Sequence, residues 1–125
     1  MQITTALDQI KSYQKELGYN FKYKDTEAQM DHIRDLALAL NVEVAEFLGW
    51  LPFKPWRPIE GQEFDVPEAA MELIDIFFFT ANLWSALGLP TSSFEELFQI
   101  KLEENLSRIS RGYNKSVETP KGETK

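Results

Sequence analysis

Two pairs of carboxylates, each with a spacing of three residues, interrupt the two most apolar helical runs of this chain. Glu43 and Glu46 lie in "NVEVAEFLGW", and Glu72 and Asp75 lie in "MELIDIFFFTANLW". Residues three apart share one face of a helix, and each pair sits on or beside an apolar stripe. Unpaired carboxylates in a core would each cost several kcal/mol by roughly the scale of ion desolvation. We therefore expect the two helices to face each other around a neutralising group.

Helical periodicity also dominates the rest of the chain, and we find no alternating strand pattern of useful length. The apolar recurrence predicts helices over about residues 3–17, Asp31–Trp50, Pro67–Leu87 and Ser93–Ser110. Asp31 is the expected N-cap of the second helix, and Ser93 with Glu96 predicts a capping box for the fourth. Between the second and third helices, four prolines in "LPFKPWRPIEGQEFDVP" forbid regular helix. Long loops of this kind in small domains are usually functional or disordered, and the large aromatic residues argue against disorder.

Length and composition narrow the possible functions. The 125 residues suit one domain, which we place at 1–115, followed by a polar and mobile tail at 116–125. A net charge of -7 makes nucleic-acid binding a poor expectation. Cysteine is absent and His32 is the single histidine, which excludes disulfides, thiolate chemistry and a multi-histidine metal site within one chain. We assign His32 itself no chemistry.

The chain shows no targeting segment. Its first residues lack the charged-then-apolar pattern of a signal peptide, and its longest apolar run, Ile76–Ala81, is far too short to span a bilayer. We therefore expect a cytoplasmic protein without a membrane partner.

The carboxylate pairs predict a metal site. Two facing helices that carry such pairs would form a cage of oxygen ligands, which suits Mg²⁺ or Mn²⁺, and helix bundles build metal sites in this manner. The alternative is that the acids face solvent or pair with Lys and Arg, which is the commoner outcome for a single pair. Two pairs on apolar stripes favour the metal site, although spacing alone names no reaction.

Positive charge gathers near the end of the chain. Lys101, Asn105 and Arg108 share one face of the last predicted helix, and "RGYNK" adds Arg111, Tyr113 and Lys115. Facing a metal-bearing acidic site, these cations would suit a phosphate chain. The alternative is a solvated face that pairs with neighbouring glutamates.

The proline-rich loop supplies a second cationic group, with Lys54, Trp56 and Arg57 in "LPFKPWR". An aromatic ring beside cations would stack a base and hold phosphate. Trp56 as a lid over the core is an equal alternative.

At this point the residues resemble a known group of enzymes. "NVEVAEF" and "MELIDIFFF" are similar to the paired ExxE and ExxD motifs of the all-α nucleoside triphosphate pyrophosphohydrolases, which include MazG-like proteins and dimeric dUTPases. "HIRDLALALNVEVAEFLGW" resembles the MazG-like pattern, whereas "LPFKPWR" and "KLEENLSRISRGY" are closer to the dimeric dUTPases. The resemblance covers roughly residues 29 to 115. It implies an all-α, four-helix MazG-like bundle assembled as a homo-oligomer, a dimer or tetramer, which would bury the exposed "IFFFTANLW".

The resemblance also implies an activity, the Mg²⁺-dependent conversion of a dNTP and water into a dNMP and pyrophosphate. Glu43, Glu46, Glu72 and Asp75 would bind Mg²⁺, with Mn²⁺ as a substitute, and Glu46 would orient or deprotonate the attacking water. The implied contacts to the nucleoside triphosphate are Lys54, Trp56, Phe79, Lys101, Asn105, Arg108, Arg111, Tyr113 and Lys115.

One departure leaves the base open. Dimeric dUTPases typically read D-x-x-H-F after the second motif, and Phe78 stands here at the histidine position. The preferred substrate is therefore dUTP, dCTP or a purine dNTP such as dGTP. A di-iron carboxylate bundle would need Glu-x-x-His motifs, which a single histidine cannot supply. A non-catalytic helical nucleotide-binding or interaction module is the remaining alternative, and the four acids together with the cationic face argue against it.

Overall fold

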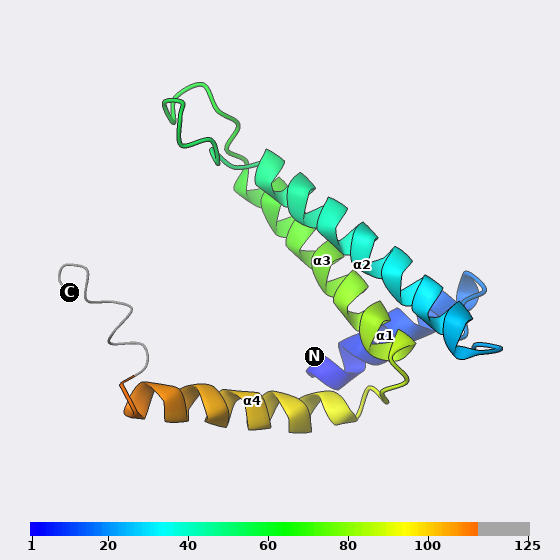
Figure 1. The fold of residues 1–125 in the computed structure, drawn as a ribbon. Coiled ribbons are helices and arrows are strands. Elements are labelled where there is room, and N and C mark those ends of the chain that lie inside the picture. Colours follow the sequence, from blue (N-terminus) through cyan, green and yellow to red (C-terminus); the bar gives the residue numbers. More distant parts are fainter. Residues whose placement is uncertain (113–125) are drawn as a thin grey trace. The chain divides into compact units, whose positions relative to one another are not determined.

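The computed structural model describes residues 1–112, so the expectations for Tyr113, Lys115 and the tail at 116–125 lie outside the described residues. The described part holds four helices and no strand: α1 (Ile3–Glu16), α2 (Thr26–Gly49), α3 (Val66–Ala86) and α4 (Ser93–Ser110) (Figure 1). The predicted all-α class is confirmed. The chain divides into two units, Met1–Thr91 with α1 to α3 and a second unit that begins at Ser92 and contains α4.

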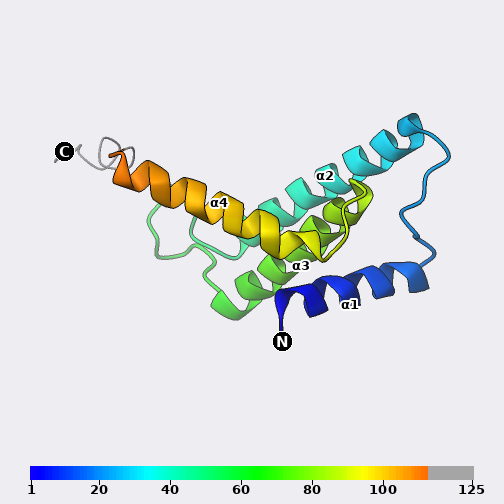
Figure 2. The ribbon, with the colours of Figure 1, turned by 90° about the horizontal axis from the view of Figure 1, so that it is seen from below.

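The first unit is built on the pairing of α2 with α3. Figures 1 and 2 show these two helices side by side and antiparallel, and α3 also contacts α1. Within residues 1–112 the buried apolar residues are three with large side chains and three alanines, namely Leu7, Ile10, Leu36, Ala69, Ala81 and Ala86. Leu38 and Met71 keep 64% and 61% of their surface exposed. The helix pair therefore leaves a large apolar surface uncovered within its own unit. None of the helices within residues 1–112 is both long enough and apolar enough to span a bilayer.

One of the predicted helix starts is wrong. α2 begins at Thr26 rather than Asp31, because Asp25 acts as its N-cap and accepts a hydrogen bond from the backbone of Ala28 at 2.8 Å. Asp31 lies inside the helix and pairs with Arg34.

α4 spans Ser93–Ser110, as predicted. Its N-cap is Ser92, whose side chain makes no capping hydrogen bond, so Ser93 is the first helical residue rather than the N-cap of the predicted capping box.

The other helix ends lie close to their predicted positions. α3 starts at Val66, one residue before Pro67, and its N-cap Asp65 accepts a hydrogen bond from Glu68 N at 3.0 Å. α1 ends at Glu16, and Gly18 follows with a φ of 99°, a left-handed conformation that glycine adopts without steric cost.

The loop between α2 and α3 has a defined shape. The backbone N–H of Asp65 donates to Trp50 O at 2.8 Å and closes the loop at its base. Within the loop, Gln62 Oε1 accepts from Lys54 N at 3.1 Å, and its Nε2 donates to the carbonyl oxygens of Lys54, Arg57 and Pro58 at 3.1, 3.2 and 2.9 Å. One amide side chain thus links the two arms of the loop.

Candidate active site

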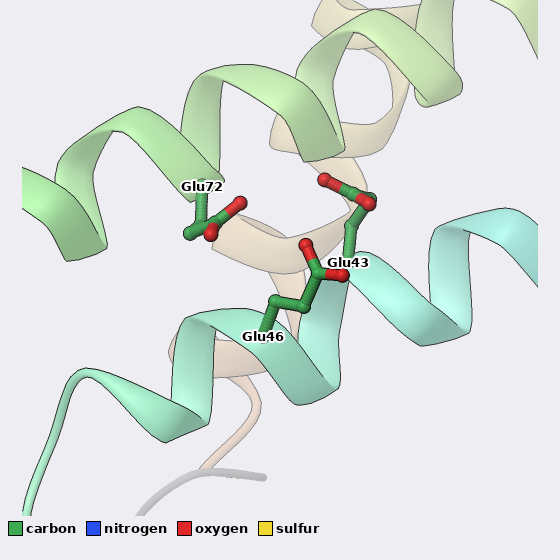
Figure 3. A group of neighbouring side chains, drawn as sticks. All are labelled: Glu43, Glu46 and Glu72. Carbon is green, nitrogen blue, oxygen red and sulfur yellow. The ribbon is translucent and has the colours of Figure 1, made fainter.

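Three glutamates converge where α2 and α3 run side by side. Glu43 and Glu46 from α2 and Glu72 from α3 each offer a carboxylate oxygen, and these oxygens all lie within 4.8 Å of one another. Figure 3 shows the three carboxylates turned toward one another across the space between the two helices. The one-turn spacing on α2 and the antiparallel pairing with α3 produce this convergence. The structure therefore brings these three predicted ligands together.

The fourth predicted ligand, Asp75, lies beside this group. Asp75 shares a hydrogen bond with Glu43, so the two carboxyl groups are in contact. Glu43 and Glu72 are half-buried, whereas Glu46 and Asp75 are exposed. The apolar residues around the two motifs therefore do not bury all four carboxylates. Within the first unit, water and a ligand can reach the exposed carboxylates of Glu46 and Asp75.

Negative charge is unfavourable in the acidic cluster formed by Glu43, Glu46, Glu72 and Asp75. Burial raises the pKa of Glu43 from 4.5 to about 7, and repulsion from Glu46 and Asp75, the hydrogen bond with Asp75 and repulsion from Glu72 add to the shift. None of the groups that shift this pKa is a cation. Among the described residues, no cation therefore acts on Glu43, and the oxygen-only donor set fits a hard divalent cation.

Trp50 supports the cluster, although it was not among the predicted site residues. Its indole Nε1–H donates to Glu72 Oε2 at 3.2 Å, which links the end of α2 to α3. The signal was available, because Trp50 follows Glu43 by seven residues and Glu46 by four and so shares their helical face. The indole fixes the orientation of one carboxylate, as ligand-supporting groups commonly do in metal sites.

A cavity of about 580 Å³ opens next to the acidic cluster and is lined by side chains from α1, α2, α3 and the segment after α1. Its size is typical of a small-molecule site. The aromatic residues of the wall are Tyr13, Tyr19, Phe78 and Phe79, and the polar ones are Gln14, His32, Asp35, Asp75 and Asn82. Asp75 belongs both to this wall and to the surroundings of Glu43. Asp75 therefore links the cavity to the acidic cluster.

His32 lies on this wall, although the sequence assigned it no chemistry. Its Nδ1 is 2.7 Å from the hydroxyl oxygen of Tyr23, and its ring stacks on Tyr19 and Phe21 with centroids 5.6 and 6.0 Å apart. The three aromatic residues belong to the segment between α1 and α2. Because these contacts join residues on different elements, helical spacing could not reveal them.

The comparison with known families agrees with this geometry. A family model described as dUTPase matches residues 6–122 and so extends over residues of both units. The chain belongs to the dUTPase family. This family is the dimeric, all-α, MazG-like type, and the resemblance drawn from the motifs is confirmed. Membership supports a nucleotide pyrophosphohydrolase-like role. No curated protein and no solved structure is similar enough to the chain to count as a match.

In this dUTPase-family chain, the loop after α2 carries predicted contacts to phosphate and base, and these residues do not line the cavity of about 580 Å³. Trp56 is 73% exposed, so it is not a lid over the core of the first unit. Lys54 Nζ lies 5.9 Å from the centroid of the Phe53 ring. Lys54 and Arg57 line a separate cleft of about 190 Å³ formed largely by the loop. Phe79, in contrast, does line the large cavity.

The cations of α4 are engaged on their own helix. Lys101 Nζ pairs with Glu104 at 2.8 Å, and Arg108 lies 3.7 Å from the same carboxylate. The hydrogen bond and the charge of Lys101, followed by the charge of Arg108, lower the pKa of Glu104. Arg111 donates to Ser107 Oγ at 2.8 Å, and Asn105 is exposed. These residues belong to the second unit, and their role toward phosphate stays a prediction.

Proposed function

We propose that this chain is a Mg²⁺-dependent pyrophosphohydrolase that converts a dNTP and water into a dNMP and pyrophosphate. The observation that carries the proposal is the convergence of Glu43, Glu46 and Glu72 within 4.8 Å, next to a cavity of nucleoside size. A cluster of carboxylate oxygens suits a hard divalent cation, and such an ion would bind phosphate oxygens. Family membership supports the same reaction class.

Glu43, Glu46, Glu72 and Asp75 would hold Mg²⁺, with Mn²⁺ as a substitute. When bound, the metal supplies positive charge to the phosphates and lowers the pKa of water. Trp50 keeps the Glu72 carboxylate turned toward the cluster through its indole N–H.

Glu46 would receive a proton from the attacking water, the role that the family resemblance implies, and its carboxylate is exposed within the group of three. The water oxygen forms a bond to the α-phosphorus and the bond between this phosphorus and the bridging oxygen to the β-phosphate breaks. Pyrophosphate leaves with that bridging oxygen, and the nucleoside keeps its α-phosphate.

The nucleoside would occupy the aromatic cavity, with its triphosphate extending past Asp75 toward the glutamates. Phe79 lies on the wall and would contact the base, as the family resemblance implied. Base preference stays open among dUTP, dCTP and dGTP. The remaining proposed substrate contacts are Lys54, Trp56, Lys101, Asn105, Arg108, Arg111, Tyr113 and Lys115.

We further propose that the chain works as a homo-oligomer, a dimer or tetramer. Leu38, Met71 and Ile74 are exposed on the paired helices of the first unit. An apolar cavity of about 560 Å³ is lined by α1 and α3 residues that include Ile74 and Phe77. Exposed apolar surface of this kind commonly marks a protein interface. Sedimentation velocity of the full chain tests this proposal, and a single monomeric species at micromolar concentration would refute it.

Pyrophosphate release from a panel of dNTPs, dUTP and NTPs with Mg²⁺ tests the activity. We expect one dNTP to dominate and Glu46→Gln to lower its turnover by roughly 10²-fold or more, the scale of a lost general base. Glu27→Gln is the matched control, since Glu27 is an exposed glutamate in the first turn of the same helix.

Two other outcomes would contradict the proposed reaction. If no nucleotide releases pyrophosphate at millimolar Mg²⁺, the catalytic proposal fails. If nucleotides raise the unfolding temperature without any release, the chain is instead a non-catalytic nucleotide-binding module.

A further inference from the structure

The amide oxygen of a buried asparagine on α3 has no hydrogen-bond partner among the described residues. Asn82 is only 5% exposed, and its Oδ1 is buried without a partner within residues 1–112. Folded proteins leave few such groups unsatisfied, because a buried acceptor that loses water and gains nothing costs free energy. Asn82 also lines the cavity of about 580 Å³. The amide is therefore placed where a ligand can supply the missing partner.

The position of Asn82 along α3 relates it to the acidic cluster. Asp75, Phe78 and Asn82 succeed one another at one-turn spacing, and all three line the same cavity. With a rise of about 1.5 Å per residue, Asp75 and Asn82 are separated by roughly 10 Å along the helix axis. One stripe of α3 thus presents a carboxylate, an aromatic ring and an amide in order, which matches the order of phosphate, sugar and base in a nucleotide.

The other groups on the cavity wall are less suited to recognise a base edge. Aromatic rings stack on every base and discriminate weakly between them. The polar side chains of Gln14, His32 and Asp35 are half-buried or exposed, and His32 Nδ1 is engaged with Tyr23. Among the polar residues of this wall, Asn82 is the one that is buried. A buried hydrogen-bonding group gives the strongest discrimination, since the wrong ligand leaves it unpaired.

We propose that the carboxamide of Asn82 reads the edge of the nucleobase. Its Oδ1 accepts a hydrogen bond from a ring or exocyclic N–H, and its Nδ2 donates to the adjacent carbonyl oxygen or ring nitrogen. This inference rests on the proposed function and makes Asn82 the residue that determines base specificity at the inner end of the cavity.

Binding of the five dNMPs (dUMP, dCMP, dTMP, dAMP and dGMP) in EDTA, measured by isothermal titration calorimetry, tests the inference without the metal. We expect wild-type affinities to differ by about tenfold or more between the best and worst base. In Asn82→Leu we expect this spread to fall to within about threefold, since no buried amide remains to be satisfied or left unpaired. Ser85→Ala is the matched control, because Ser85 is a 6% exposed polar residue of the same helix that does not line the cavity.

Thermal unfolding separates a ligand-reading amide from a structural one. Asn82→Leu removes a buried acceptor that has no partner, so we expect its unfolding temperature without ligand to match or exceed that of the wild type. A marked fall would mean that leucine does not fit this position, and Asn82→Asp then decides. If Asn82→Leu does not fold, Asn82→Asp keeps the volume and replaces the donor by an acceptor. A changed order of dNMP affinities in Asn82→Asp supports the inference, and an unchanged order overturns it.

Three other results would also overturn the inference. Asn82→Leu with an unchanged base spread would show that the amide does not read the base. An equal loss of affinity for all dNMPs, together with lost discrimination against 2′,3′-dideoxynucleotides, would assign the amide to the sugar hydroxyl instead. Absence of wild-type binding to every dNMP at millimolar concentration would show that the cavity takes no base.

The same proteins separate this inference from the proposed function. Pyrophosphate release whose base preference is the same in wild type and Asn82→Leu defeats the inference and leaves the function intact. Base-selective dNMP binding without pyrophosphate release from any dNTP defeats the function and leaves the inference intact.

Discussion

The acidic cluster between α2 and α3 and the cationic face of α4 are built alike but behave differently. Each places like-charged residues on one helical face: Glu43 and Glu46 lie one turn apart on α2, and Lys101 and Arg108 lie two turns apart on α4. On α4, Glu104 lies among the cations and pairs with Lys101 and Arg108. In the acidic cluster, burial and then repulsion from other carboxylates raise the pKa of Glu43 to about 7. Like charges on one helical face therefore do not identify a site by themselves, and the two regions differ in the partners that the described residues give them.

We expect the largest effect on turnover when a carboxylate of α3 that faces α2 is removed. Replacing Glu72 with Gln removes a negative oxygen from the group of three and should lower turnover at saturating Mg²⁺ by about 10²-fold or more, the scale of a disrupted metal site. Glu68→Gln, in the exposed first turn of the same helix, should keep wild-type turnover. Steady-state pyrophosphate release against Mg²⁺ concentration measures both, and equal activity of the two variants would remove Glu72 from the site.

A smaller effect is expected on α4. If Lys101 turns from Glu104 to a phosphate in the complex, Lys101→Ala should raise KM by roughly tenfold, about the value of one charge-assisted hydrogen bond. Glu104→Gln frees the same cation and should leave KM unchanged or lower it. Lys24→Ala, an exposed lysine of the first unit, is the control. An unchanged KM in Lys101→Ala would mean that the pair with Glu104 is only a surface salt bridge, which contributes little to stability.

The two regions should also respond oppositely to pH. Because the folded-state pKa of Glu43 is raised, its protonated form stabilises the metal-free fold below pH 4.5, and this stability is lost as pH rises through about 7. Glu104 has a lowered pKa, so its contribution is present above its ordinary value of 4.5 and is lost as pH falls through the lower folded-state pKa. Thermal unfolding in EDTA from pH 3 to 8 measures both contributions.

Variants assign each branch of that pH profile to its residue. Glu43→Gln should flatten the decline of the unfolding temperature toward neutral pH, and Glu104→Gln should weaken the decline in acid. Saturating Mg²⁺ should remove the decline toward neutral pH in the wild type, because metal binding favours the deprotonated carboxylate. A profile that is the same with and without Mg²⁺ would argue against a metal at Glu43.

The smallest expected effect concerns the orientation of one carboxylate. Trp50→Phe keeps the ring but removes the N–H that donates to Glu72. We expect the apparent Mg²⁺ affinity to fall by about tenfold, the lower end for groups that support metal ligands, with little change in kcat at saturating metal. Trp56→Phe, which alters an exposed tryptophan of the loop, should leave the Mg²⁺ affinity unchanged. Equal Mg²⁺ affinity in wild type and Trp50→Phe would show that the indole does not position the ligand.

The sequence predicted those features that depend on residues of a single helix. The existence of four helices and the shared faces of Glu43 with Glu46 and of Glu72 with Asp75 all follow from helical spacing. The predicted start of α2 was wrong because Asp25 and Asp31 are both good N-cap residues, and residue type alone does not distinguish them. Glu46 and Asp75 are exposed although their neighbours in sequence are apolar, because the sequence does not show which part of a helix face the partner helix covers.

The features that the sequence missed depend on contacts between elements. Trp50 reaches Glu72 across the helix pair, and His32 meets the aromatic residues of a connecting segment. In the sequence, nothing distinguishes Asn82 from other polar residues on helices. Its position became evident from the cavity that it lines and from the missing partner of its Oδ1 among the described residues. Such contacts are fixed by tertiary packing, which single-helix periodicity does not contain.

The loop after α2 has a consequence for protein engineering. It begins and ends at one backbone hydrogen bond, from Asp65 N to Trp50 O, and Gln62 holds its interior through four further bonds. Three backbone hydrogen bonds, from Phe53 N to Leu51 O, Arg57 N to Lys54 O and Gln62 N to Ile59 O, also lie within the loop. A single codon change at Gln62 would nevertheless remove all four side-chain bonds together.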